Sequence, residues 1–105
     1  MSERPSASSV LQGAINAALE GLARGLALEF SPVCVNTVSP GLINTPLWSS
    51  LDDKTRAAMF NRLSENLPAK IVGKPEHIAN AVTFLMRTPF ATGSNVRVDG
   101  GGAIA

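Results

Sequence analysis

The longest hydrophobic pattern in the chain has helical spacing and runs from about residue 9 to residue 30. Leu11, Ile15 and Leu22 recur at intervals of four and seven, as they do on one face of a helix. Alanines and further leucines between them spread the apolar surface over most of the circumference. The pattern predicts a helix that is buried on most sides. Packing against the chain's own strands is the preferred interpretation, and an interface with a helix of another subunit is the alternative. The two can hold together on different faces of the helix, and its glycines favour a close approach in both cases.

The next segment changes from helical spacing to a run of β-branched and apolar residues. Residues 33–38 predict a strand that is apolar on both faces, as in a buried parallel sheet, with Asn36 as the exception. Because a buried amide needs hydrogen-bond partners, Asn36 is expected to tie neighbouring loops together. Pro40 and Gly41 break the strand and open a loop, and ligands of open α/β sheets bind beyond the carboxyl ends of the strands. Residues 39–45 are therefore the predicted functional loop.

A second helix is predicted after this loop. Ser49 or Ser50, each followed three residues later by an aspartate, fits a capping box and predicts a helix over roughly residues 51–66. Leu47 and Trp48 precede this helix. Plain packing is the interpretation preferred for Trp48, and a lid over the functional loop is the alternative.

A third helix and a short strand complete the pattern. Pro75 at a first helical position predicts the start of the helix, and Thr88 with Pro89 predicts its end. Residues 96–98 predict the strand, with Arg97 on the opposite face from its valine neighbours, as in an edge strand.

The glycine-rich segment after that strand, residues 99–102, has the composition of a phosphate-binding loop. No helix follows it in the sequence, so it lacks the context that such a loop requires. It is interpreted as a flexible, close-packed tail.

Composition and charge narrow the class of protein. The 105 residues suffice for one α/β domain, spanning residues 1–105, and they contain no internal repeat. Only 16% of the residues are charged, against about a quarter in typical domains, which indicates that much of the surface is covered. The net charge of +1 is scattered, which argues against nucleic acid as a partner. No apolar run is long enough to cross a membrane.

Candidate chemistry outside the functional loop is sparse. Cys34 is the single cysteine, so no internal disulfide can form, and with no signal peptide at the N-terminus a cytoplasmic location is expected. His77 is the single histidine and has no metal-ligand spacing to other residues, so it is interpreted as a surface residue. No metal site is predicted.

Four blocks of the sequence, taken in order, resemble the C-terminal half of the short-chain dehydrogenase/reductase family. The blocks are Ala17–Leu22, Val35–Gly41 with Thr45, Gly73–Glu76 with Ile78 and Ala79, and Val96–Gly101. The Asn-x-x-x-Pro-Gly block that leads to a threonine, followed by the terminal Asp-Gly-Gly, is fairly specific. The blocks together cover nearly the whole chain.

The resemblance implies an α/β fold, namely the C-terminal part of a Rossmann-like doubly wound fold, and a nicotinamide cofactor, NAD or NADP. In the family the Pro-Gly loop passes beside the nicotinamide and bonds its carboxamide or a nearby phosphate. The matching cofactor-binding positions here are Pro40, Gly41, Ile43 and Thr45. The segment over about residues 46–67 corresponds to the family's mobile substrate lid.

At the catalytic positions, this sequence departs from the family's pattern. The family uses Tyr-x-x-x-Lys on the long helix, and the register places Gln12 at the tyrosine position and Asn16 at the lysine position. The chain contains no tyrosine, and a glutamine amide cannot act as an acid or base near neutral pH. The family's catalytic serine would fall at or before residue 1. No catalytic residue is therefore predicted in this chain.

The resemblance covers only half of a dinucleotide-binding fold, which needs six strands, and two strands are predicted here. An incomplete sheet of two strands is marginal by itself. The chain is therefore expected to form a homo-oligomer or to pair with a second chain that completes the sheet. The predicted function is the C-terminal segment of an NAD(P)-dependent oxidoreductase that is inactive alone. The alternative is a non-catalytic oligomerisation or interaction module derived from that family.

Overall fold

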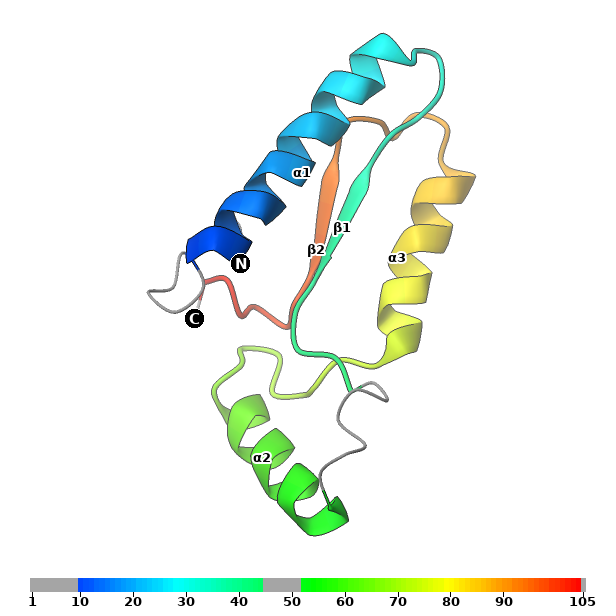
Figure 1. Cartoon of the computed structure of the whole chain (residues 1–105). Coiled ribbons are helices and arrows are strands. Elements are labelled where there is room, and N and C mark those ends of the chain that lie inside the picture. The colour runs from blue at the N-terminus through cyan, green and yellow to red at the C-terminus, as the bar shows by residue number, and fades with distance from the viewer. Residues whose placement is uncertain (1–9, 45–51, 105) are drawn as a thin grey trace.

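The computed structural model describes residues 10–44 and 52–104, and these residues form both helices and strands (Figure 1). The mixed helix and strand content confirms the predicted α/β class. In chain order the elements are α1 (Val10–Glu29), β1 (Thr37–Pro40), α2 (Asp53–Glu65), α3 (Pro75–Arg87) and β2 (Asn95–Val98). The long helix and the helix starting at Pro75 agree closely with the hydrophobic pattern.

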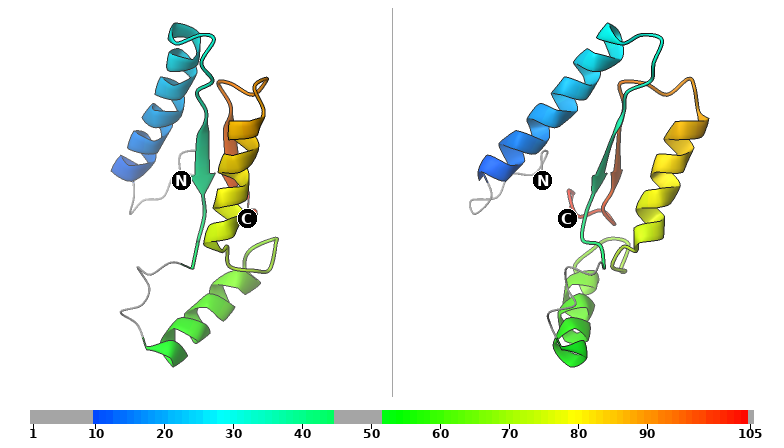
Figure 2. Two further views of the ribbon diagram at one scale, coloured as in Figure 1. Left: turned by 90° about the vertical axis from the view of Figure 1, so that its right-hand side faces the viewer. Right: turned by 45° about the vertical axis from the view of Figure 1, so that its right-hand side comes forward.

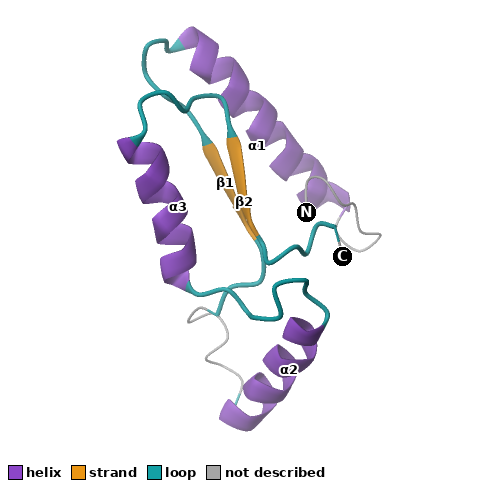
Figure 3. Cartoon of the chain, turned by 180° about the vertical axis from the view of Figure 1, so that it is seen from behind, coloured by secondary structure: helices purple, strands orange, loops and turns teal. Residues whose placement is uncertain are grey.

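The two strands pair in parallel and form the centre of the molecule. Thr37 lies opposite Asn95 and Pro40 lies opposite Val98, so the carboxyl ends of both strands meet at one edge. Helices α1 and α3 flank the strands on opposite sides, whereas α2 stands beyond the carboxyl edge (Figures 2 and 3). The described residues form the two-stranded sheet that was predicted as incomplete.

The two faces of the sheet differ in polarity. The Ser39 hydroxyl lies 3.4 Å from Glu20 Oε1 on α1, so the face that carries Thr37, Ser39 and Asn95 is turned toward α1. Val38, Val96 and Val98 alternate with these residues and are turned toward α3. The prediction of a strand that is apolar on both faces is therefore wrong for the α1 side.

Strand β1 begins four residues later than predicted, and before Thr37 the two segments are joined by a backbone bond from Gly93 N to Val35 O at 2.8 Å and by the side chain of Asn36. The Asn36 amide donates to Ala91 O at 2.8 Å and accepts from Ser94 N at 3.0 Å. These two bonds join the loop before β1 to the loop before β2, which confirms the tying role predicted for Asn36. Pro40, predicted to break the strand, is instead its last residue.

Helix α1 is much less buried than its apolar pattern predicts. Ala23 is its one buried residue, whereas Leu11 is 74% exposed and Leu28 is 84% exposed. Most of the remaining large side chains on the helix are also exposed. The described part of the chain supplies a sheet on one side of α1 and leaves its outer side uncovered.

The helix ends show which residues act as caps. Asp52 is the N-cap of α2, and its Oδ1 accepts from Thr55 N at 2.6 Å. The cap therefore lies later than either serine of the predicted capping boxes. Those serines, together with Leu47 and Trp48, lie outside the described residues. At α3, Lys74 N donates to His77 Nδ1 at 3.0 Å, so the histidine side chain helps to close the first turn.

Candidate functional site

The loop after β1 is held against the end of β2 by a contact that leaves no room for a side chain. Gly41 N donates to Val98 O at 2.9 Å, which extends the parallel pairing beyond Pro40. A Cβ atom on Gly41 would lie 2.6 Å from Asp99 Cα, far inside van der Waals contact. Gly41 is therefore required by the close approach of two backbones.

The next two residues of the loop are held from the other side by the segment that precedes α3. Ile43 and Gly73 form a parallel bridge, in which Gly73 N donates to Leu42 O at 3.0 Å and Asn44 N donates to Gly73 O at 2.9 Å. A Cβ on Gly73 would lie 2.5 Å from Ile43 Cδ1. The loop is thus fixed between Asp99 and Gly73.

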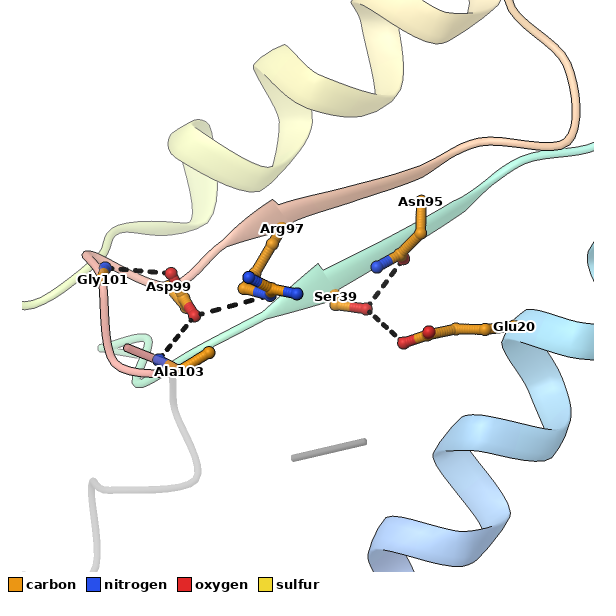
Figure 4. A network of polar contacts seen from close by, with 7 residues as sticks. All are labelled: Glu20, Ser39, Asn95, Arg97, Asp99, Gly101 and Ala103. Atoms are coloured by element: carbon orange, nitrogen blue, oxygen red, sulfur yellow. Dashed lines mark hydrogen bonds and ion pairs between the residues drawn. The ribbon is translucent and has the colours of Figure 1, made fainter. Parts of the chain in front are cut away.

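Asp99 organises the turn that follows β2, as Figure 4 shows. Its two carboxylate oxygens accept from Gly101 N at 2.9 Å and from Ala103 N at 3.1 Å, and Arg97 Nε lies 3.9 Å away. Gly100 and Gly101 both have positive φ, and a Cβ on Gly101 would lie 2.6 Å from Pro68 Cγ. The close packing predicted for this segment is confirmed. Its hydrogen bonds make it a defined turn rather than the flexible tail that was predicted.

The positions that match the family's catalytic pair lie on the first turns of α1, toward the carboxyl edge of the strands (Figure 1). Asn16 is half-buried and lies one helical turn before Glu20, the residue that contacts Ser39. Gln12 lies one turn earlier and is exposed. Figure 4 shows the Glu20, Ser39 and Asn95 contacts that connect α1 to the sheet.

The structure thus brings three of the four predicted cofactor positions together. Pro40, Gly41 and Ile43 follow one another at the carboxyl edge, and Thr45 lies outside the described residues. Sequence reasoning missed Gly73 and Asp99 as the two supports of the loop. The Asp-Gly-Gly signal was visible, but its contact with Gly41 joins positions far apart in the sequence.

Among the described residues no group of three His, Cys, Asp or Glu side chains is arranged to hold a metal ion. Over the same residues, no helix combines the length and the apolarity needed to cross a bilayer.

Parallel strands flanked by helices, with a fixed loop at the carboxyl edge, define the doubly wound α/β class, and known proteins specify the family. A family model described as enoyl-(acyl carrier protein) reductase matches residues 2–102. The 3-oxoacyl-(acyl-carrier-protein) reductase FabG of Vibrio harveyi is 38% identical over 84% of this chain. The chain belongs to the short-chain dehydrogenase/reductase family.

Solved structures agree with this assignment. A small-chain dehydrogenase in complex with NADPH has a TM-score of 0.89 and 36% identity, over 99% of this chain and 48% of its own. An NADPH-bound short-chain oxidoreductase from Pseudomonas aeruginosa PAO1, described as containing an atypical catalytic center, has a TM-score of 0.77 and 31% identity, over 89% of this chain and 38% of its own. The chain covers 36% of the FabG protein, so it spans less than half the length of each of these relatives.

Proposed function

We propose that this chain is the C-terminal part of an NAD- or NADP-dependent short-chain oxidoreductase and supplies its nicotinamide-side loop and substrate lid. The observation that carries the proposal is the position of the loop over residues 40–43. It follows a parallel strand at the carboxyl edge of the sheet and is fixed by Asp99 and Gly73. Ligands of doubly wound folds bind at this edge.

The bridge to Gly73 orients the backbone of the loop. The bridge to Gly73 uses Leu42 O and Asn44 N, the groups on either side of Ile43. In a parallel pairing the N–H and C=O of Ile43 itself then point to the opposite side. The bridge therefore fixes the direction in which the Ile43 backbone faces, at the position where the family resemblance places the nicotinamide.

A bound nicotinamide cofactor would supply hydride transfer. The residues of this chain would determine how the substrate oxygen and the ribose are held and whether a proton is transferred with the hydride. Gln12 can hold a substrate oxygen by a hydrogen bond but has no proton to exchange near neutral pH. Asn16 can bond a ribose hydroxyl but carries no charge that would lower the pKa of a neighbouring acid. The chain alone is therefore proposed to bind a dinucleotide weakly and to catalyse no hydride transfer.

Calorimetric titration with NAD(H) and NADP(H) tests this proposal in two forms of the chain. The chain alone should release little heat with any of the four dinucleotides. The same chain fused behind the N-terminal part of the small-chain dehydrogenase that was solved with NADPH should bind NADPH. In that fusion, Gln12→Tyr together with Asn16→Lys should raise NADPH-dependent reduction by at least tenfold. A folded fusion that binds no NADPH, or that reduces equally well without the two substitutions, would contradict the proposal.

A non-catalytic assembly module is the second candidate, and the uncovered outer side of α1 favours it. Large apolar side chains are exposed on that helix, and the catalytic pair of the family is replaced. Under this alternative the chain forms a stable homo-oligomer, and the fusion described above shows no heat with any dinucleotide. A mass measurement beside the titration separates the two candidates.

A further inference from the structure

The functional loop and the first turn of α3 are joined through a single peptide unit, the one between Gly73 and Lys74. Its carbonyl, Gly73 O, accepts from Asn44 N at 2.9 Å at the end of the loop. Its N–H, Lys74 N, donates to His77 Nδ1 at 3.0 Å on α3. Because a peptide unit is planar and rigid, the two bonds share one orientation of this group. The side chain of His77 therefore affects the position of the loop.

The ring of His77 lies beside this connection. His77 is half-buried, and it lines the same cavity as Ile43 and Gly73. Lys74 has the extended backbone of an N-cap residue, and its carbonyl accepts from His77 N at 2.9 Å. Both backbone polar groups of Lys74 are thus bonded to His77, one to its backbone and one to its ring.

The bond from Lys74 N requires a neutral imidazole. Nδ1 accepts a hydrogen bond only while it carries no proton, and the ring proton is then on Nε2. The imidazolium form donates from both nitrogens, so it would leave Lys74 N–H without its acceptor. A positive charge in the first turn of a helix is also disfavoured by the partial positive charge of the helix N-terminus. Histidine is the side chain that ordinarily changes its charge between about pH 5 and 8.

The charged groups around the ring come from two elements. Lys74 and Glu76 are its charged neighbours at the start of α3. Among the described residues that line the cavity from other elements, Asp99 is the titratable one. Its carboxylate is turned toward the α1 side of the sheet, where its oxygens accept from Gly101 N and Ala103 N. The loop itself contributes apolar residues to the wall. The charge of the ring therefore determines whether the bond from Lys74 N forms.

We propose that His77 is a positioning residue of the functional loop and that its protonation loosens the loop. Neutral His77 holds the peptide unit between Gly73 and Lys74 in the orientation that bonds Asn44. As the pH falls and the ring gains a proton, the bond from Lys74 N is lost, the peptide unit can rotate, and the bond from Asn44 N to Gly73 O weakens. The effect on a bound nicotinamide rests on the function proposed above, whereas the coupling between His77 and the loop does not.

Hydrogen exchange of backbone amides, followed by NMR on the full chain without any cofactor, tests this coupling. The protection factor, which is corrected for the intrinsic pH dependence of exchange, should fall about fivefold or more at Asn44 between about pH 8 and pH 5. Gly41 N, bonded to Val98 O on the other side of the loop, should keep its protection factor within about twofold. Equal losses at Asn44 and Gly41, or no loss at Asn44, would overturn the proposal.

Two substitutions separate the charge of the ring from the loss of its packing. His77→Gln keeps an acceptor at the third helical position, where glutamine is common in capping boxes, but it does not titrate. The protection factor of Asn44 should then be independent of pH. His77→Leu has no acceptor at any pH, so protection of Asn44 should be low throughout.

An Asn44 response in His77→Gln that equals the response of the unmodified chain would contradict the assignment to His77. If His77→Leu does not fold, the comparison of His77→Gln with the unmodified chain decides alone. Because the measurement needs no dinucleotide, its outcome is independent of whether the chain binds one.

Discussion

A single missing Cβ atom at Gly41 allows the functional loop to approach Asp99. In Gly41→Ala the new atom would lie 2.6 Å from Asp99 Cα, so one of the two backbones must move. Because overpacking of this kind typically costs about 1–3 kcal/mol, we expect the free energy of unfolding to fall by that amount in urea denaturation.

Gly25→Ala is the matched control for this prediction. A Cβ on Gly25, inside α1, would meet nothing within 4 Å. Since alanine is favoured over glycine inside a helix by about 1 kcal/mol, this change should raise stability. Similar losses for the two glycines would show that the contact with Asp99 is not what Gly41 provides.

Asp52 makes the start of α2 sensitive to acid. Hydrogen bonds from the Thr55 hydroxyl and then from its backbone N–H hold the pKa of the Asp52 carboxyl below its ordinary value. A lowered pKa in the folded state means that the cap contributes fully above the unfolded pKa and is lost as the pH falls through the folded value. The Thr55 amide resonance should therefore report fraying of α2 at and below about pH 4.

The variant Asp52→Asn distinguishes this effect from general acid unfolding. An asparagine side chain also caps a helix, but it does not titrate in this range. The variant should therefore lose the acid-dependent change at Thr55. If Thr55 responds to pH in the same way in both chains, the Asp52 carboxylate is not the cause.

At the scale of the elements, the start of β1 depends on the side chain of Asn36. Asn36→Ala would leave Ala91 O and Ser94 N without the bonds that join the two loops. Unpaired partly buried polar groups cost about 1–3 kcal/mol, so the free energy of unfolding should fall by that amount. Asn61→Ala on the exposed surface of α2 should change it by less than about 0.5 kcal/mol. If Asn36→Ala leaves the free energy of unfolding unchanged, the role assigned to this amide is contradicted.

The same elements show how far sequence reasoning could reach. Helices α1 and α3 were predictable within a residue or two, because their spacing and the terminal Pro75 are local signals. The bounds of β1 were not, because pairing requires β2 as a partner and β2 spans only Asn95–Val98. The loop itself was predicted from Pro40 and Gly41. Its supports at Gly73 and Asp99 were not, since nothing local in the sequence reports a contact between distant segments.

For the whole molecule, the uncovered side of α1 is the surface on which the prediction of a homo-oligomer can be tested. Ile15 is 53% exposed and Leu22 is 56% exposed on this helix. If that side forms an interface between chains, Ile15→Glu together with Leu22→Glu should shift sedimentation from the oligomer toward the monomer. A charge buried in an interface without a partner is strongly disfavoured, so a weakening of at least tenfold is expected.

Phe90→Glu is the control, because Phe90 is 99% exposed and lies in the loop before β2 rather than on α1. This change should leave the sedimentation of the oligomer unchanged. Folded monomer at micromolar concentration in the unmodified chain would contradict the expectation of a homo-oligomer.

The bridge between Ile43 and Gly73 has a consequence for how this architecture can diversify. It joins the two ends of residues 44–72, so this stretch, which contains α2, leaves the sheet and returns to it at a neck that also includes the contacts of Pro68 and Ala69 with the turn after β2. The entropic cost of closing such a stretch grows only slowly with its length. Insertions, deletions or a wholly different helix can therefore be accommodated beyond the neck without a change in strand register. Relatives can then differ in the segment that stands at this edge of the sheet while they keep the same parallel strands in the same register.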